Sequence, residues 1–598
     1  MIALTQNPLK YLLLLTLGLM LGACSIPRTA PPMDPLWANQ LLIDNAAHYA
    51  GNEKYMRYLY ESRTWVPAHA LSEDTVELGK RAQIPVQHAS AKILGPSYED
   101  ALRSLALKIW MIEQAEHTVD VVYYIFKQDL AGQAILGALC NAVKRGVDVR
   151  VMVDAAGSYS ITHNDLRKLM RCAADAGHMR DAQHGLTEHR ARVQAVVFNA
   201  MTSTTSWVNR RSHDKLLITD GAFPDKALVM TGGRNISLDY YGINADGSPD
   251  PTAYRDLEIL LRPTANDSYS DISIGNVSET YFGLLFMHGG NKKLAPMQES
   301  SSTLLNAEPV TNYSAAQRSL ETLKSFPEIR QRLDDMPTYL EQDMRDAQVR
   351  LAHELANLTN RKVVTQTREN LASNENSIMR LIEDIGYQGR QSGVLRIVSP
   401  YMFMAKYYDE AGNVILDDAE AMRNWLEEHP DNRIEIITNS VLTSDNFMAQ
   451  SIIDMDMAPR LLLTPDIESE WLAASESSEP PPDLVSSESW KQLINNPRIH
   501  IYQTGRLDSV KLGTGSQHYG KLHAKFIVGI ENGFVGTANF DYRSRLFNNE
   551  MGFFYRNEDL HQDLIDTFER LKASSYRWGS PEWLELRRQV MQVKGMKG

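Results

Sequence analysis

The hydrophobic pattern of the chain contains one arrangement twice. In the first half, apolar or alternating runs at 117–126 and 147–153 predict strands, and an apolar stripe across 131–145 predicts a helix between them. Such a short crossover implies a parallel strand pair. The same strand–helix–strand order recurs at 393–399, 417–428 and 433–438. The pattern therefore predicts an α/β fold built by internal duplication.

The length of 598 residues indicates more than one domain. We predict five segments: a signal peptide at 1–24, a tether or N-terminal extension at 25–90, a first α/β domain at 91–275, a helical linker or insertion at 276–390 and a second α/β domain at 391–598. Residues 313–381 are charged and helical in pattern, which suggests a spacer, or alternatively a cover over a cleft or a lipid-facing surface. The acidic stretch 473–489 is poor in apolar residues and predicts a disordered loop.

The N-terminus carries an apolar run after Lys10 that is too short to span a bilayer core of roughly 30 Å, so it predicts a signal peptide. Leu21-Gly22-Ala23-Cys24 resembles the bacterial lipobox, which implies cleavage before Cys24, lipidation of its thiol and a membrane anchor. We therefore expect a periplasm-facing envelope protein, with the outer membrane slightly favoured over the inner. Cys140 and Cys172 can form a disulfide there, or remain two buried thiols.

A candidate phosphate site begins at His213 and Lys215, which lie two residues apart at the start of an apolar run. On a strand, residues i and i+2 point to one face, so the imidazole and the ammonium project together. The following Gly232-Gly233 turn permits close backbone approach, and Asn235 adds an amide. A histidine, a cation and a neutral donor suit a phosphate.

One such motif is usually a surface or internally satisfied pair, but this chain has a second. His523, Lys525, Gly536 and Asn539 follow in the same order, again around an apolar strand and a turn. Two copies in one chain indicate an active site rather than two chance pairs.

The two motifs resemble the H-x-K-x-x-x-x-D signature that occurs twice in phospholipase D superfamily chains. His213, Lys215 and Asp220 fit the first copy in full. In the second copy, Ile530 stands where the aspartate belongs and Glu531 follows it, so the supporting carboxylate is in doubt.

Further segments at 115–126, 142–154, 208–215 and 232–242 resemble bacterial cardiolipin synthases, in particular the shorter branch without two N-terminal membrane helices. The continuation of the second motif is similar to the family at Asn539, Asp541, Ser544 and Glu550. The resemblance implies two α/β/α sandwich halves with the active site at their interface.

The resemblance also implies roles for these residues. Asp256 and Glu550, at corresponding positions, would each orient a catalytic histidine, although Asp256 can also be a strand-edge charge paired with Arg255. His213 would be the nucleophile and His523 the acid and base, an assignment that the symmetric motifs alone do not make. The remaining roles are phosphate stabilisation by Lys215, Lys525, Asn235 and Asn539, and support by Asp220 and Ser544.

Arg210 and Arg211 are candidate phosphate ligands or, equally, surface charges. No metal and no cofactor are expected, because the lysines supply positive charge. No metal-binding cysteine spacing occurs in the sequence either.

The resemblance favours a phosphatidyltransferase that makes cardiolipin from phosphatidylglycerol and a second phospholipid such as phosphatidylethanolamine. The alternative is a phospholipase D that hydrolyses phospholipids to phosphatidic acid. A nuclease or a non-catalytic envelope lipoprotein is less favoured. The net charge of −13 argues against non-specific nucleic-acid binding, so membrane phospholipids are the expected partners, and the sequence identifies no protein partner.

Overall fold

The computed structural model describes residues 33–158, 163–200, 209–297, 313–387, 393–440, 443–444, 458–474, 482–505 and 520–595. The predicted signal peptide and Cys24 lie outside these ranges. Within them, no helix is both long and apolar enough to cross a membrane.

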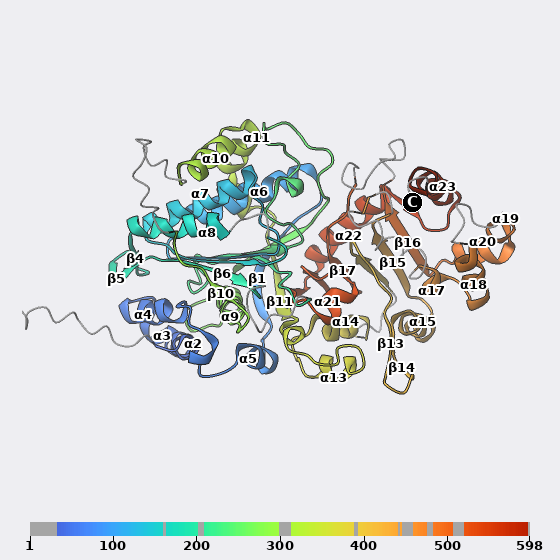
Figure 1. Cartoon of the computed structure of the whole chain (residues 1–598), viewed down its shortest axis with the longest axis horizontal. Coiled ribbons are helices and arrows are strands. Elements are labelled where there is room, and N and C mark those ends of the chain that lie inside the picture. The colour runs from blue at the N-terminus through green and yellow to red at the C-terminus, as the bar shows by residue number, and fades with distance from the viewer. Residues whose placement is uncertain are drawn as a thin grey trace, which may run out of the picture.

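A single sheet of sixteen strands forms the centre of the described chain (Figure 1). Its order from edge to edge is β10 (Lys292–Lys293), β6 (Val193–Phe198), β3 (Asp148–Asp154), β2 (Thr118–Tyr123), β7 (Lys215–Thr219), β8 (Leu228–Gly232), β9 (Glu258–Pro263), β1 (Gln87–Leu94), β11 (Arg345–His353), β19 (Met551–Arg556), β18 (Gly533–Gly536), β17 (Phe526–Val528), β12 (Val394–Val398), β15 (Arg433–Thr438), β16 (Ile499–Thr504) and β20 (Ser575–Arg577).

The strand order is symmetric about the antiparallel pair β1–β11, in which Ala89 lies opposite Ala347. Outward from this pair, β9, β8, β7, β2, β3 and β6 match β19, β18, β17, β12, β15 and β16. The outer three strands of each series are parallel, and the inner pairs are antiparallel. The predicted duplication of an α/β unit is thus visible in the topology.

Helices cover both faces of the sheet (Figure 1). In the first half, α6 (Tyr98–Gln114) and α7 (Leu130–Arg145) pack on one face and α9 (Ile274–Phe286) on the other. Ser97 is the N-cap of α6, because its side chain accepts a hydrogen bond from the amide of Asp100 at 3.0 Å. The core under α9 continues without a break to α22 (Glu558–Ala573) of the second half, so the halves share one apolar interior.

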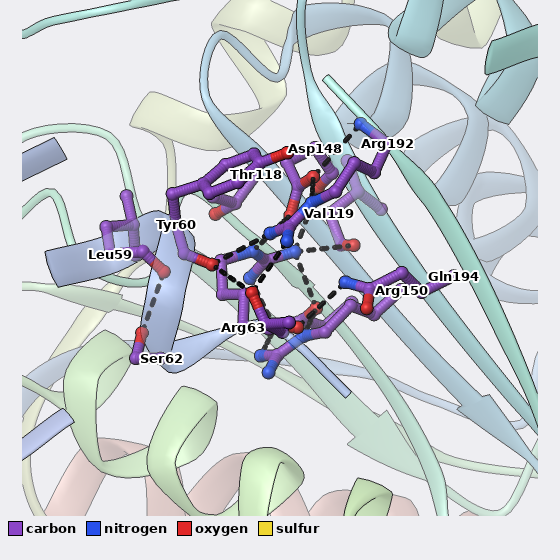
Figure 2. Close-up of polar contacts among 12 residues, drawn as sticks. Leu59, Tyr60, Ser62, Arg63, Thr118, Val119, Asp148, Arg150, Arg192 and Gln194 are labelled. Carbon is purple, nitrogen blue, oxygen red and sulfur yellow. Dashed lines mark hydrogen bonds and ion pairs between the residues drawn. The ribbon is translucent and has the colours of Figure 1, made fainter. Parts of the chain in front are cut away.

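The predicted extension at 25–90 contains helices α2 (Pro35–Asp44), α3 (Ala46–Tyr49), α4 (Glu53–Ser62) and α5 (Thr75–Arg81), and then strand β1. Arg63, directly after α4, enters a buried group of charges in the first half (Figure 2). The residues from α2 to α5 are therefore packed parts of the first half.

The charge group contains three guanidinium groups and three carboxylates. The Arg63 guanidinium lies 2.9 Å from a carboxylate oxygen of Asp120 and 2.9 Å from one of Asp148, and it also pairs with Glu279. Arg150 binds Asp120 through two nitrogens at 2.7 and 2.6 Å, and Arg192 lies 2.9 Å from Asp148. The group is electrically balanced, which buried charges require.

One expected helical segment is wrong. Residues 345–353, within the predicted helical insertion at 276–390, form strand β11 at the centre of the sheet. Ala347, Val349 and Leu351 are buried in strict alternation, and this period of two decides the structure because β1 and β19 pair on either side. In the order of elements, β11 and the following α14 (Ile378–Tyr387) correspond to β1 and α6.

The predicted disordered loop at 473–489 is also wrong in its described part. Residues 475–481 lie outside the described ranges, but α19 (Pro482–Ser486) and α20 (Glu488–Ile494) follow directly. Leu484 and Trp490 are buried, and they anchor this acidic stretch to the second half.

A disulfide joins Cys140 of α7 to Cys172 of a short 3₁₀ helix, Arg171–Asp175, with the two Cα atoms 5.6 Å apart. Of the two alternatives that the sequence left open, the structure contains the disulfide.

Candidate active site

The two histidines meet where the halves join. His213 precedes β7, and its amide donates to the carbonyl of Asn549 at 2.9 Å, while the Asn549 amide donates to the carbonyl of Arg211 at 2.8 Å. This short pairing therefore joins the start of the first motif to the second half.

The second motif makes the equivalent pairing, with the second half supplying the histidine and the first half supplying the carboxylate. The amide of His523 donates to the carbonyl of Arg255 at 2.8 Å, and the Arg255 amide donates to the carbonyl of Lys521 at 2.7 Å. Because Asn549 and Arg255 directly precede Glu550 and Asp256, each pairing carries a carboxylate to the histidine of the opposite half.

The carboxylate–histidine contacts are crossed between the halves. Nδ1 of His213 lies 2.9 Å from Oε2 of Glu550, and Nδ1 of His523 lies 2.7 Å from Oδ2 of Asp256. A carboxylate on Nδ1 fixes the ring orientation and tautomer and leaves Nε2 to the substrate. The sequence motifs name all four residues but do not say which carboxylate serves which histidine.

Glu550 has two hydroxyl donors. Ser544 Oγ donates to its Oε1 at 2.5 Å, and Thr537 Oγ1 donates to its Oε2 at 2.7 Å. The sequence analysis did not identify Thr537, which occupies the place of Gly233 when the two Gly-x-x-Asn turns are aligned. At Gly233 a Cβ atom would lie 1.9 Å from Oδ1 of Asp256, so only glycine allows the carboxylate to pack there.

Both lysines lie in the buried centre of the site. Nζ of Lys215 donates to the carbonyl of His213 at 2.7 Å, and Nζ of Lys525 lies 2.7 Å from Nδ1 of His523. Burial lowers the pKa of Lys215 to about 8, although Glu550 and Asp256 oppose that shift. Lys215 therefore remains mostly protonated at neutral pH.

Both histidines are neutral near pH 7. Burial, followed by the charges of Lys215 and Lys525, lowers the pKa of His213 well below its usual value. Burial and Lys525 also lower the pKa of His523 to about 4, against the opposing charge of Asp256.

The two carboxylates differ in charge. Burial raises the pKa of Glu550 to about 7. Burial would also raise the pKa of Asp256, but three effects outweigh it and lower the pKa: the charge that His523 carries once it is protonated in acid, the charge of Lys525 and the hydrogen bond with His523. Near neutral pH, Asp256 is ionised and Glu550 is only partly ionised.

The two asparagines do not have the same contacts. Asn235 is held at both ends, because its Oδ1 accepts from the amide of Ile125 at 3.0 Å and its Nδ2 donates to Tyr240 Oη at 2.8 Å. Asn539 is buried, and its Oδ1 has no hydrogen-bond partner among the described residues. Asn539 is thus the more available of the two amides for a ligand.

Three tyrosines, which the sequence analysis did not single out, form aromatic walls. The ring of Tyr124 lies 4.9 Å from that of His213, and the rings of Tyr240 and Tyr254 lie 5.1 and 5.3 Å from that of His523. Their only signal in the sequence is proximity to the motifs.

Asp220 stabilises the sheet and does not touch the reacting centre. Its carboxylate accepts from the amides of Glu116, His117 and Thr118 at 2.7–3.0 Å, at the start of β2. It lies at the opposite end of β7 from His213, about 20 Å away for seven extended residues.

In the second half, an asparagine accepts the backbone hydrogen bond at the corresponding place before the strand. The amide of Gly393, before β12, donates to Oδ1 of Asn432 at 2.8 Å. Ile530 is partly buried and packs against the apolar core, and Glu531 pairs with Arg556 at 3.0 Å. Ile530 and Glu531 therefore take no part in the contacts of His523 with Asp256 and Lys525.

Arg210 and Arg211 are neither surface charges nor free to bind phosphate in this structure. Both are buried, and Arg210 donates to the carbonyls of Asn357 and Asn360. Arg211 donates to the carbonyl of Asn199 at 2.9 Å. Their contacts join the segment before His213 to the rest of the fold. No group of three histidine, cysteine or acidic side chains suited to a metal occurs among the described residues.

Comparison with known proteins relates this site to phospholipid enzymes. The family model described as "Cardiolipin synthase, PLD-like domain" matches residues 109–246, which include His213, Lys215 and Asn235. The chain is 23% identical to cardiolipin synthase C of Escherichia coli (strain K12) over 521 residues, or 81% of this chain and 88% of that protein.

Two further comparisons are more limited. Cardiolipin synthase of Geobacillus kaustophilus is 26% identical over 185 residues, 31% of each chain. The crystal structure of phosphatidylserine synthase from Haemophilus influenzae Rd KW20 aligns with a TM-score of 0.47 and 12% identity, covering 86% of this chain and 96% of that one.

Proposed function

We propose that this chain, which is similar to cardiolipin synthases, transfers phosphatidyl groups through a phosphohistidine. The observation that carries the proposal is the pair of buried histidines, each with Nδ1 on a carboxylate of the opposite half. Two imidazoles beside two lysines suit a double displacement at phosphorus, because one attacks while the other moves the proton.

The charges of the two pairs support His213 as the nucleophile. The pKa of His213 is strongly lowered, so its ring stays neutral. Its Nδ1–H can donate to the ionised form of Glu550 and to the carbonyl of Thr537 at 3.1 Å, which leaves the lone pair of Nε2 free to attack. His523 faces an ionised Asp256, which stabilises an imidazolium. The negative charge of a bound phosphodiester acts in the same direction as Asp256 and would raise the pKa of His523 from its low value of about 4. The ring could then carry the proton that the leaving group needs.

In the first step, Nε2 of His213 forms a bond to phosphorus, and the bond from phosphorus to the headgroup oxygen breaks. His523 gives its proton to that oxygen, and the headgroup leaves as an alcohol. In the second step, neutral His523 takes the proton of an acceptor hydroxyl, whose oxygen attacks phosphorus and releases His213. Phosphatidylglycerol as acceptor gives cardiolipin, and water as acceptor gives phosphatidic acid.

Lys215, Lys525 and Asn539 would stabilise the charge that develops on the phosphoryl oxygens. Their polar groups are buried and already ordered, so little reorganisation accompanies the reaction. Asn235 would act mainly by positioning, since both ends of its amide are bound by protein.

The proposed location is the periplasmic side of the bacterial envelope, with a lipid on Cys24 as the anchor and the outer membrane slightly favoured. The Cys140–Cys172 disulfide supports an oxidising compartment. An anchor of this kind would hold the site next to its phospholipid substrates.

The test uses protein that lacks residues 1–24, a deletion outside the described structure, mixed with phosphatidylglycerol vesicles with and without phosphatidylethanolamine in EDTA. Mass spectrometry resolves the products. We expect cardiolipin, with glycerol or ethanolamine released according to the donor, and no product from His213→Ala or His523→Ala protein of unchanged circular dichroism. Phosphatidic acid alone would make the protein a hydrolase. Turnover by either histidine variant at the wild-type rate would overturn the two-histidine mechanism.

A further inference from the structure

A cavity of about 820 Å³ lies in the second half, beside the active-site motif. Its lining includes residues of α14, of strand β14 (Val414–Asp417), which forms a hairpin with β13 (Lys406–Tyr408), and of α15 (Asp418–Glu428). Its volume is within the range of about 300–1,000 Å³ that is usual for ligand pockets.

The lining of this cavity is mostly apolar, and four of its side chains are methionines. They are Met379, Met402, Met404 and Met422, and Phe403 lies among them. Methionine is unbranched and flexible, so such a wall adapts to an apolar ligand of variable shape. The lining therefore suits a hydrocarbon chain better than a polar or nucleotide ligand.

The cavity borders the segment that follows the active-site Asn539. Phe540 and Asp541, which directly follow Asn539, form part of its wall. The amide of Phe403 donates to the carbonyl of Phe540 at 2.8 Å, and Asp541 accepts from the amide of Ser544 at 2.8 Å. Since Ser544 also donates to Glu550, one short segment separates the apolar cavity from the carboxylate that holds His213.

Two arginines at the cavity carry unpaired charge. Arg368 and Arg380 are exposed, and neither makes an ion pair with a described carboxylate. Four acidic residues also line the cavity. Asp417 pairs with Lys406 at 3.0 Å and Asp418 with Arg545 at 2.9 Å, whereas Asp541 accepts a backbone hydrogen bond and Glu420 is exposed. Guanidinium groups without an acidic partner beside an apolar cavity complement an anionic lipid.

Exposed apolar side chains surround the same cavity. Tyr408 and Val414 of the hairpin are 45% and 46% exposed, Tyr542 is 49% exposed and Val364 is 37% exposed. An ion pair of 2.9 Å between Lys362 and Glu410 joins the hairpin to the segment that carries Val364. Figure 1 shows the hairpin beside α13 (Thr367–Ala372) and α14 at one edge of the molecule. Tyrosine and aliphatic side chains gathered in this way are typical of a membrane contact.

We propose that this cavity holds an acyl chain of the membrane phospholipid whose phosphate reacts at His213, and that the exposed face around it rests on the bilayer. The inference rests on the proposed function and names the part of the substrate that this region recognises. A soluble phosphodiester has no hydrocarbon chain that a methionine-lined cavity beside the catalytic motif could bind.

The first test fills the cavity without removing any packing. Ala421 lies on α15 with its side chain at the cavity, and Ala421→Trp adds an indole there. The matched control is Ala573→Trp, at the exposed end of α22 in the same half. Turnover is compared on dioleoyl phosphatidylglycerol vesicles and on water-soluble dihexanoyl phosphatidylglycerol.

We expect Ala421→Trp to lower turnover of the dioleoyl lipid at least tenfold and to leave turnover of the dihexanoyl lipid within twofold of wild type. The control should match wild type on both. Equal dioleoyl turnover by the two variants, or equal losses on both lipids in Ala421→Trp, would overturn the proposal.

The second test does not depend on turnover. His213→Ala protein is mixed with phosphatidylglycerol that carries a diazirine near the end of one acyl chain, irradiated, digested and analysed by mass spectrometry. Labels between residues 402 and 424 support the proposal. Labels instead around His288 and Phe547, which line a separate cavity of about 1110 Å³, would overturn it. If wild-type protein transfers no phosphatidyl group at all, the proposed function fails, and this labelling still decides the fate of the acyl site.

Discussion

Replacing Arg63 with methionine removes the central cation of the buried charge group in Figure 2. Asp120 keeps two contacts with Arg150 at 2.7 and 2.6 Å, and Asp148 keeps Arg192 at 2.9 Å. Of the three carboxylates, Glu279 loses the most electrostatic stabilisation, because its remaining cation, Arg150, lies 3.6 Å away. Breaking a buried ion pair usually costs about 3–5 kcal/mol, and the surviving partners place this substitution near the lower value, about 3 kcal/mol.

The stability lost on replacing Arg63 with methionine should depend on pH, and the direction can be worked out. Burial raises the pKa of Glu279, and the charge of Arg63 opposes that shift. Without Arg63 the pKa of Glu279 rises further, so the variant protonates this carboxyl at mildly acidic pH and escapes part of the penalty. A carboxyl whose folded pKa is raised loses stability as pH rises through that pKa. The difference between wild type and variant should therefore be larger at pH 8 than at pH 5.

Hydrogen exchange is the suitable assay, because a chain of this size need not unfold in one step. The readout is the free energy of opening for amides of α4 and β2, with Arg57→Met as the matched control. Arg57 is exposed on α4, and its replacement should change stability by no more than about 0.5 kcal/mol. If Arg63→Met and Arg57→Met differ by less than that, the buried charges do not hold the N-terminal helices.

Three further outcomes follow from the site and from the proposed anchor. Glu550→Gln should lower turnover at least a hundredfold. It should also raise the thermal unfolding midpoint above that of wild type at pH 8 but not at pH 5, because the pKa of Glu550 is about 7 and the buried carboxyl is charged only at the higher pH. Equal midpoint differences at both pH values would contradict this. Asp256→Asn should slow transfer from phosphatidylglycerol far more than from a p-nitrophenyl phosphodiester, whose leaving group needs no proton from His523, and equal losses would argue against that role. Cys24→Ser should move the full-length protein from the membrane to the soluble fraction, and retention on the membrane would refute the proposed anchor.

Much of the fold could be predicted from local pattern. Strands β2 and β15 lie within the runs at 117–126 and 433–438 that predicted them. The central strand β11 was missed, because its arginines and aspartate resemble an amphipathic helix when its neighbours in the sheet are unknown. Pairing with β1 and β19 buries Ala347, Val349 and Leu351, and that contact is not local in the sequence.

The candidate site shows the same division. Spacing on a strand was sufficient to bring His213 and Lys215 together, and repetition of the motif indicated a second pair. The crossing of the carboxylates depends on backbone pairing between residues some 300 positions apart, which spacing does not encode. Thr537 and Asn432 were missed for a related reason, since their hydrogen bonds have no counterpart of the same residue type in the first half.

The pairing of β1 with β11 and the exchange of carboxylates together describe an isologous contact, in which two equivalent surfaces meet about a two-fold axis. A single half with a free edge at β1 would meet a second copy through the same hydrogen bonds and complete both catalytic pairs. The present chain thus has the architecture of a homodimer whose subunits have become covalently linked. Linkage frees the two copies to diverge, which explains why glycine stands beside Asp256 while threonine stands beside Glu550.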